Sequence, residues 1–377
     1  MDRPEGRPPG AAADRERLRA RAVGGASLLL GALALQQAAT RSPALVERLY
    51  SRGLQPFLGG SLGAATGLVP FSVAEVLAWG ITAFLGVAAV RAVLGGRRRL
   101  ARLAANGLLV AGAAWLSFLL LWGLNYRRQP FASSAGLEVR PARLDELAAL
   151  GAILIEEANE ARHGLPEDAA GVMRLPGGPR ATLARTDAGF AAAARRYPVL
   201  AGGPSRPKPV AASVVLSWLG ITGIYSPFTG EPNVNMTVPD PELPFCASHE
   251  VAHARGFARE DEANYLGYLA CRAHPDREFR YSGLLAASVY AVNALAALDP
   301  PGGERLAARR SPSVGRDLGA LAAWAARYRG PAWEAARGVN DAYLRAQGQA
   351  DGARSYGRMV DLLLAERRAE AAGGPSP

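Results

Sequence analysis

The chain has 377 residues, of which 49% are hydrophobic and 20% charged, a balance that leans away from a purely soluble protein. Its formal net charge is +10, carried almost wholly by arginine, because Lys208 is the only lysine. The arginines gather beside apolar segments, which argues against a nucleic-acid-binding face and favours membrane flanks. The two cysteines, Cys246 and Cys271, exclude a disulfide-rich scaffold, and we favour two buried thiols over a single bridge.

Three apolar segments follow a charged N-terminal tail, residues 1–21. They cover residues 22–39, 72–94 and 103–124. Because about 20 mostly apolar residues span a bilayer, each segment is a candidate membrane helix. The first resembles a signal peptide, but its charged leader is long and no convincing small-residue cleavage site follows, so we expect a retained helix.

The arginines beside these segments predict their orientation. One group lies at 15–21, before the first segment, and another at 97–102, between the second and the third. Basic residues are in excess on the cytoplasmic side of membrane proteins, so both groups are predicted to be cytoplasmic. The third helix then leads outward, and residues 125–368 form an extracytoplasmic domain. Arg127 and Arg128 oppose this rule but are outnumbered.

Residues 125–368 have the pattern of a mainly α domain with a small β-sheet, an α+β fold. Apolar residues recur at three- and four-residue steps in 141–163, which predicts a helix. β-branched and aromatic residues bounded by glycine predict strands at 211–218 and 221–225. The other expectations are an extended proline-rich loop at 226–245, a buried core helix at 282–298, helices at 332–347 and 353–368, and a disordered tail at 369–377.

The run His249-Glu250-Val251-Ala252-His253 is the strongest functional signal in the chain. Residues four apart share one face of a helix, so both imidazoles would point at one spot. Two neutral imidazoles can hold Zn²⁺ there, with Glu250 beside it as the general base that passes a proton from water to the leaving amine. Because the chain has only four histidines, a metal site is favoured over a chance occurrence of this spacing.

A catalytic zinc site needs a third protein ligand. The pattern with a third histidine is excluded, because its position is occupied by Arg259. Residues 260–264, Glu-Asp-Glu-Ala-Asn, resemble the ExxA(D/N) element of zincins whose third ligand is a glutamate. That resemblance implies Glu260 as the ligand and Asn264 as the residue that hydrogen-bonds a ligand histidine. The other candidates for the third ligand are Glu262 first, then Asp261 and His274.

Residues 223–235 precede the motif and mix turn residues with polar groups. Zincins hold a peptide substrate along an extended edge strand beside the active-site helix. By that analogy, three side chains are candidates to line a cleft or stabilise an oxyanion: Tyr225, Asn233 and Asn235. An ordinary loop rich in proline and glycine explains the same stretch equally well.

Several blocks of the chain resemble a bacterial membrane family of unknown function, catalogued as domain of unknown function thirty-eight-ten and placed among zincin-like metallopeptidases. The blocks include GLNYRR at 123–128 and SPFTGEPNVN at 226–235, with further ones at 70–72, 243–245, 249–270, 340–344 and 355–364. The resemblance covers nearly the whole chain after residue 20. It implies a zincin-like fold behind N-terminal membrane helices in a bacterial cell membrane, and it implies no substrate.

These patterns together predict a membrane-anchored zinc metallopeptidase that hydrolyses peptide bonds outside the cytoplasm. The expected partners are the lipid bilayer, one Zn²⁺ ion and a peptide or protein substrate; we expect no nucleic acid and no organic cofactor. The alternative is a catalytically inactive zincin-like protein that binds peptides or cell-envelope components, although ligation alone would not need Glu250. A transporter fits less well, because Glu75 and Arg91 are the only charges in the second apolar segment.

Overall fold

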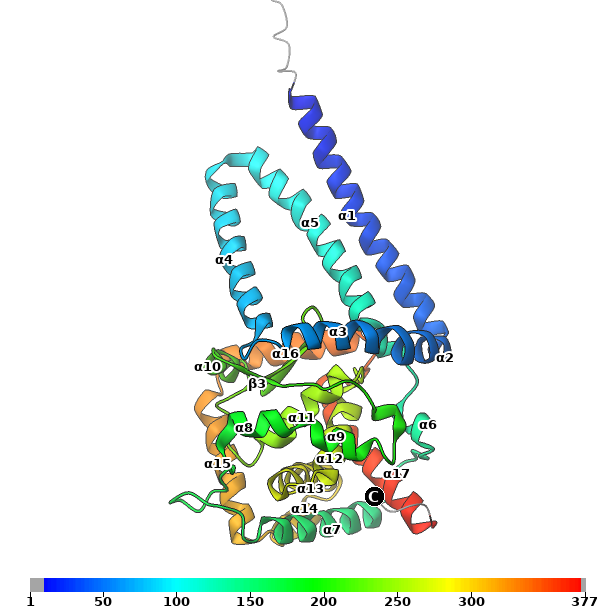
Figure 1. The fold of residues 1–377 in the computed structure, drawn as a ribbon, viewed down its shortest axis with the longest axis vertical. Coiled ribbons are helices and arrows are strands. Elements are labelled where there is room, and N and C mark those ends of the chain that lie inside the picture. Colours follow the sequence, from blue (N-terminus) through cyan, green and yellow to red (C-terminus); the bar gives the residue numbers. More distant parts are fainter. Residues whose placement is uncertain (1–9, 374–377) are drawn as a thin grey trace, which may run out of the picture.

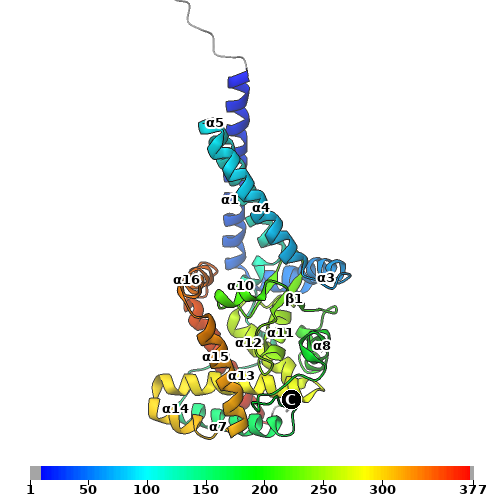
Figure 2. The same cartoon turned by 90° about the vertical axis from the view of Figure 1, so that its left-hand side faces the viewer.

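Three long helices stand out from one side of the protein in the computed structural model, which describes residues 10–373 (Figure 1). They are α1 (Gly10–Arg41), α4 (Val73–Leu94) and α5 (Gly96–Leu121). Seen at right angles, the three overlap in a narrow column above the rest of the chain (Figure 2). We call them the apolar helices, and we call residues 122–373 the body. The described chain is 73% helical, with a small mixed sheet of three strands.

Within the described residues, four helices are long and apolar enough to cross a membrane, namely the apolar helices and α13 (Arg277–Leu298). The most apolar stretches of the first three are at most 17% buried within the protein, whereas that of α13 is 56% buried. The exposed sides of the apolar helices fit a membrane protein. The burial of α13 agrees with the core helix predicted at 282–298.

The two arginine groups lie at the same end of the apolar helices, remote from the body (Figure 1). Arg21 donates to Asn106 Oδ1 at 2.7 Å, and Arg102 pairs with Asp14, so the start of α1 lies beside the start of α5. A three-pass membrane topology requires this arrangement; which side of the membrane that end faces stays a prediction. Residues 10–21 of the predicted tail are already helical, and residues 1–9 lie outside the described part.

A helical segment without a counterpart in the sequence-based expectations runs across the base of the apolar helices (Figure 1). It consists of α2 (Pro43–Leu45), the π-helix η1 (Val46–Leu54) and α3 (Gln55–Thr66), and we call it the base segment. Leu49 and Phe57 are 62% and 70% exposed on it. A helix that lies flat at this level with exposed apolar side chains has the character of a membrane-interface helix.

The sheet has the order β1-β3-β2. The central strand β3 (Glu231–Asn235) is buried throughout, with β1 (Lys208–Val210) parallel to it and β2 (Gly223–Ser226) antiparallel. The predicted strand at 221–225 overlaps β2. The loop predicted at 226–245 is only partly a loop, because β3 lies inside it and gains main-chain partners from both neighbouring strands.

The strand predicted at 211–218 is wrong, because residues 213–218 form the short helix α10 (Ser213–Trp218). The Ser217 hydroxyl donates to the Ser213 carbonyl one turn earlier, at 2.9 Å. Val214 and Val215 are exposed on this helix, so the β-branched run does not pack on a pleated surface. These β-branched residues lie on an outer surface of the body instead.

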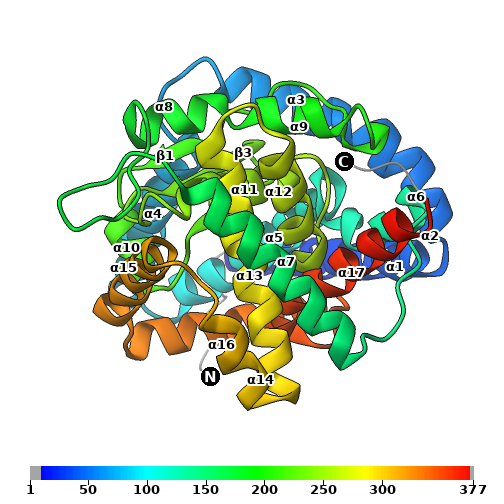
Figure 3. The same ribbon diagram turned by 90° about the horizontal axis from the view of Figure 1, so that it is seen from below.

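The core of the body forms where α12 (Glu260–Ala273) crosses α13, and α7 (Leu144–Arg162) covers the far side of α13 (Figure 3). Tyr265 and Phe279 are fully buried in it. The remaining elements of the body are η2 (Gly123–Arg127), α6 (Phe131–Ala135), α8 (Gly178–Arg185), α9 (Asp187–Ala193), η3 (Pro198–Leu200), α11 (Leu243–Ala254), α14 (Pro300–Ala307), α15 (Pro312–Tyr328), α16 (Pro331–Ala346), η4 (Gly352–Arg358) and α17 (Met359–Ala371).

The remaining helix predictions are confirmed, and the predicted C-terminal tail needs one correction. The helices predicted at 141–163 and 332–347 correspond to α7 and α16. The one predicted at 353–368 begins as the 3-10 helix η4 and continues as α17. The disordered tail is wrong for residues 369–371, which still belong to α17; Arg367 and Arg368 anchor this helix to acidic residues of α7. Residues 374–377 lie outside the described part.

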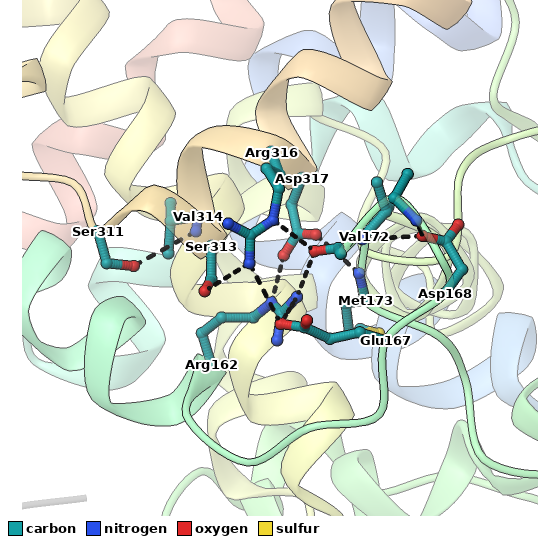
Figure 4. A network of polar contacts seen from close by, with 12 residues as sticks. Arg162, Glu167, Asp168, Val172, Met173, Ser311, Ser313, Val314, Arg316 and Asp317 are labelled. Carbon is teal, nitrogen blue, oxygen red and sulfur yellow. Dashed lines mark hydrogen bonds and ion pairs between the residues drawn. The ribbon is translucent and has the colours of Figure 1, made fainter.

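A buried polar network joins α7, α13, α15 and the loop after α7 (Figure 4). Arg162 Nε donates to Asp317 Oδ2 at 2.6 Å, and both side chains are at most 2% exposed. The other Asp317 oxygen accepts the Met173 backbone N–H at 2.8 Å, and the Tyr281 hydroxyl donates to Oδ2 at 2.5 Å. One carboxylate therefore satisfies three donors from three parts of the fold.

We predict that Asp317→Ala lowers the free energy of unfolding by about 3–5 kcal/mol. The buried Arg162 charge keeps only the partly exposed Glu167, at 3.0 Å, and the buried Met173 N–H and Tyr281 hydroxyl lose their acceptor. Glu156→Ala is the matched control: it removes an acid from the exposed Arg309–Glu156 pair and should cost about 1 kcal/mol or less. Unfolding of the purified protein in detergent measures both. Equal losses in the two variants would contradict the role given to Asp317.

Candidate metal centre

The two histidines of the HExxH motif lie one turn apart on α11, as the spacing predicts. Their Nε2 atoms are 3.1 Å apart. The helix ends at Ala254, Arg255 caps it, and Gly256, with a φ of 81°, reverses the chain. A β-carbon is strained in that conformation, and one built on Gly256 would also lie 2.9 Å from Gln55 Oε1 of the base segment. Glycine is therefore required where the chain turns back.

The turn brings the start of α12 against the histidines. Glu260 Oε2 lies 3.3 Å from His249 Nε2 and 3.4 Å from His253 Nε2. Gly267, also on α12, permits this close crossing, because a methyl group there would come within 3.1 Å of the His249 backbone nitrogen. The three side chains form a group, within residues 10–373, whose ligand atoms all lie within 4.8 Å of one another.

The other candidates for the third ligand point elsewhere. Glu262 Oε1 accepts the backbone N–H of Phe131 at 2.7 Å, and its other neighbour is Arg259 at 3.8 Å. His274 stacks on Phe279, with ring centroids 3.7 Å apart, and its Nε2 lies 3.0 Å from the Arg185 carbonyl. Asp261 is not a member of the cluster. Of the four acids and imidazoles considered, the structure brings Glu260 to the histidines.

The chemistry of the three donors fits a zinc ion. His253 Nδ1 lies 2.7 Å from the Phe257 carbonyl, which can only accept, so Nδ1 carries the proton and Nε2 offers its lone pair to the cluster. In a tetrahedral site with bonds of about 2.0–2.1 Å, neighbouring donors lie about 3.3 Å apart. The three observed separations, 3.1, 3.3 and 3.4 Å, agree with one face of such a tetrahedron.

The buried charges favour a cation at this spot. Burial alone would raise the pKa of Glu260, but the imidazoles of His253 and His249 outweigh it and lower the pKa below its ordinary value. Burial alone would lower the pKa of His253, and the Glu260 carboxylate reverses that shift. An ionised carboxylate thus faces two ring nitrogens at a site where the three side chains are 8–12% exposed.

Glu250 lies on α11 beside the cluster and is 4% exposed, and its Oε2 has no hydrogen-bond partner among the described residues. Burial raises its pKa, while the two imidazoles and a backbone hydrogen bond from Tyr225 lower it. A methyl group built on Gly223 would lie 2.5 Å from Glu250 Oε1. The absence of a side chain at Gly223 is what leaves room for the Glu250 carboxylate beside β2.

The strand β2 is an edge strand of the sheet and lies next to Glu250. The Asn235 N–H donates to the Thr222 carbonyl at 2.9 Å, and hydrogen-bonded pairs alternate along an antiparallel ladder. In the observed register, Ile224 is therefore bonded to β3, and the main-chain groups of Gly223 and Tyr225 face away from it. The Glu250 carboxylate already takes the backbone hydrogen bond from Tyr225, and an extended peptide could pair with the remaining groups beside it.

The three residues predicted for a cleft differ in their surroundings. Tyr225 lies on β2 and packs on Trp122, with ring centroids 5.5 Å apart. Asn233 accepts from the Ser72 hydroxyl at 2.6 Å and donates to the Glu231 carbonyl at 2.9 Å. Asn235 donates to the Ile221 carbonyl and to Ser217 Oγ. Both asparagines lie on β3, next to β2, and are at most 1% exposed, so they are buried supports of the sheet.

Two residues beside the cluster are absent from the sequence-based expectations. Trp122, just beyond α5, donates from Nε1 to the His253 carbonyl at 2.9 Å and sets its ring edge against the His253 ring. Tyr290 of α13 accepts from Asn264 Nδ2 at 3.0 Å. Each lies in an apolar stretch, where the sequence alone assigns an aromatic residue to a membrane helix or to the protein core. The block that begins at Gly123, next to Trp122, is the one signal that pointed to this region.

The two cysteines are free thiols in the described part of the chain, as favoured above. Cys271 lies 3.3 Å from the Ser248 hydroxyl, between α11 and α12. Burial raises the pKa of Cys271 to about 12. Both thiols are therefore inert packing groups near neutral pH.

Comparison with known families places the chain. A family model described as "Protein of unknown function (DUF3810)" matches residues 50–364. The chain belongs to this family. The match takes in α4, α5, most of the base segment and the whole candidate metal centre. No similar protein was found among the curated proteins or among the solved structures.

We predict that Gly256→Ala lowers the free energy of unfolding by about 1–2 kcal/mol, because the new side chain must adopt a left-handed conformation. Gly319→Ala is the matched control: it lies in α15 with open space around it, and alanine should raise stability by about 0.5–1 kcal/mol. Unfolding in detergent compares the two. A Gly256→Ala protein as stable as Gly319→Ala would show that the turn does not need glycine.

Proposed function

We propose that this protein is a membrane-anchored zinc metallopeptidase of the zincin-like type. The observation that carries the proposal is the convergence of His249, His253 and Glu260, with Glu250 beside them, from two helices that meet at a glycine turn. A structural zinc site does not need a buried carboxylate next to its three ligands, whereas peptide hydrolysis uses one as the general base.

Three side chains would hold the ion, namely His249, His253 and Glu260. Hydrogen bonds from neighbouring residues hold these ligands in position. The Phe257 carbonyl orients His253, and Trp122 holds the carbonyl of the same residue. Asn264 follows Glu260 by one turn of α12, which is the position of the residue that orients a ligand in the related element. Zinc, when bound, supplies Lewis-acid activation of water and of the scissile carbonyl.

Glu250 would move the proton. Its carboxylate accepts a proton from the attacking water, and it returns that proton to the nitrogen of the leaving amine as the C–N bond breaks. Its raised pKa suits both steps, because a proton that is held too weakly could not be delivered. Gly223 leaves the carboxylate its space, and the outer edge of β2 would hold the substrate main chain in an extended conformation.

We also propose that the body lies outside the cytoplasm. Both arginine groups lie at the end of the apolar helices that is remote from the body. By the positive-inside rule, that end is cytoplasmic, so the metal centre lies on the other side of the bacterial cell membrane. Its substrates are then peptides or proteins of the cell envelope or the exterior.

We predict that Glu260→Gln lowers zinc affinity about tenfold or more, because the amide offers a neutral ligand in place of a carboxylate. Glu262→Gln is the matched control, two residues away, and it should keep zinc because this carboxylate bonds the Phe131 amide. Metal analysis of both purified proteins, titrated with a zinc chelator, measures the difference. Loss of zinc from Glu262→Gln, with zinc retained by Glu260→Gln, would show that Glu262 and not Glu260 is the third ligand.

We predict that Glu250→Gln keeps its zinc but loses peptide hydrolysis by about 10²–10⁴-fold, because no base remains to take the proton. Gly223→Ala should have the same phenotype in a milder form, since its methyl group displaces the carboxylate. Proteomic comparison of cleaved peptides from cells with wild-type and variant protein measures the activity. If Glu250→Gln supports every function of the wild type, the protein is an inactive peptide- or envelope-binding relative.

A further inference from the structure

A second polar site lies apart from the metal cluster, where the apolar helices end. It is a pocket of about 210 Å³. Four separate segments line it: the junction of α1 and α2 at Thr40 and Pro43, residues 126–128 and 130 after α5, Arg259 before α12, and residues 347–349 after α16. Because α1 and α5 both end beside it, the pocket lies at the level where those helices would leave the apolar layer of a bilayer.

The pocket carries more positive than negative charge. Of its three arginines, Arg128 is neutralised by Glu47, with contacts of 2.8 and 2.9 Å. Arg127 bonds the Gln347 carbonyl, and no ion pair with an acid is found for it among the described residues. Arg259 has its nearest acid, Glu262, at 3.8 Å. Burial lowers the pKa of Arg127, and repulsion from the Arg259 guanidinium lowers it further.

Three residues that line the pocket also carry buried polar atoms without hydrogen-bond partners: Arg127, Gln347 and Gln349. Gln347 is 2% exposed, and neither its Nε2 nor its Oε1 has a hydrogen-bond partner within residues 10–373. The same holds for Arg127 Nε and for Gln349 Nε2. Buried polar groups in proteins are almost always satisfied, so such a concentration in one pocket points to a ligand. Three of these four atoms are N–H donors, which an oxyanion would satisfy.

We propose that this pocket binds a phosphate group, held by the guanidinium groups of Arg127 and Arg259 and by the side-chain amides of Gln347 and Gln349. Phosphate matches the donor set, because its oxygens accept charged hydrogen bonds from several directions at once. Two sources share this chemistry: the headgroup of an anionic phospholipid and a free phosphate. The place of the pocket at the ends of α1 and α5 favours the lipid headgroup.

The pocket is joined to the metal centre through the start of α12. Gln349 Oε1 accepts the backbone N–H of Glu260 at 3.3 Å, and Arg259 directly precedes that residue. A phosphate that orders Gln349 and Arg259 would therefore also order the backbone of Glu260. This coupling rests on the proposed metal site, whereas the phosphate site does not, so the two can fail separately.

The test uses the full-length purified protein in nanodiscs of phosphatidylcholine with and without 30% phosphatidylglycerol, and in detergent with and without inorganic phosphate. We expect phosphatidylglycerol to raise the unfolding temperature of the wild type, and native mass spectrometry to find it bound. Arg127→Gln and Arg259→Gln should weaken binding about tenfold or more. Arg48→Gln, at an exposed arginine of the base segment outside the pocket, should change it less than twofold.

Gln347→Leu separates the pocket from general attraction to an anionic surface, because it removes a donor without changing the net charge. We expect it to weaken phosphatidylglycerol binding severalfold while leaving the unfolding temperature in phosphatidylcholine unchanged or higher. Stabilisation by inorganic phosphate that the same variants abolish would assign the site to a soluble phosphate. Equal binding by wild type, Arg127→Gln and Gln347→Leu would overturn the proposal, whatever the zinc content of the three proteins.

Discussion

The clamp of Arg128 between Glu47 and the Gly256 carbonyl is the contact on which the metal centre depends. The buried guanidinium donates two hydrogen bonds to Glu47, a third of 2.9 Å to the Gly256 carbonyl, and lies 4.1 Å over the Phe257 ring. Burial raises the pKa of Glu47, but Arg128 and Arg52 outweigh it and keep the carboxylate ionised. A bidentate pair of this kind fixes position as well as energy. What it fixes is the left-handed turn that places Glu260 against the two histidines.

The same clamp ties the body to the base segment, since Glu47 lies on η1 and Arg128 follows the last apolar helix. Two more contacts lie at this junction. Ser51 of η1 donates to Asn125 Oδ1 at 2.8 Å, and Trp122 donates to the His253 carbonyl. A domain boundary at residue 125, which the end of the third apolar segment suggests, therefore cuts through the supports of the metal centre. The apolar helices and the body share one polar junction, and the metal ligands lie directly beneath it.

The sequence could predict the two histidines and the base because their geometry is local: four residues of helix set it. It left Glu260 and Glu262 open because both belong to the first turn of one helix. Two residues of an α-helix turn the side chain by about 200°, so at most one of them can face α11, and only the crossing of the helices decides which. The strand at 211–218 failed for a related reason, since Val214 and Val215 lie on an outer helix and have no sheet to pack on. Trp122 was hidden because an aromatic residue at the end of an apolar run is also what a membrane boundary would show.

The role of the apolar helices follows from these contacts rather than from anchoring alone. Without the chain before residue 125, Arg128 would lose Glu47, and a buried charge without its partner costs about 3–5 kcal/mol. The guanidinium would then be drawn toward water and away from the Gly256 carbonyl, and the His253 carbonyl would lose the Trp122 donor. Each loss acts on the segment between His253 and Glu260, whose shape brings the three ligand atoms together. The junction with the apolar helices is thus part of the metal centre's own construction, and a body released from them would hold the HExxH helix without the turn that completes its ligand set.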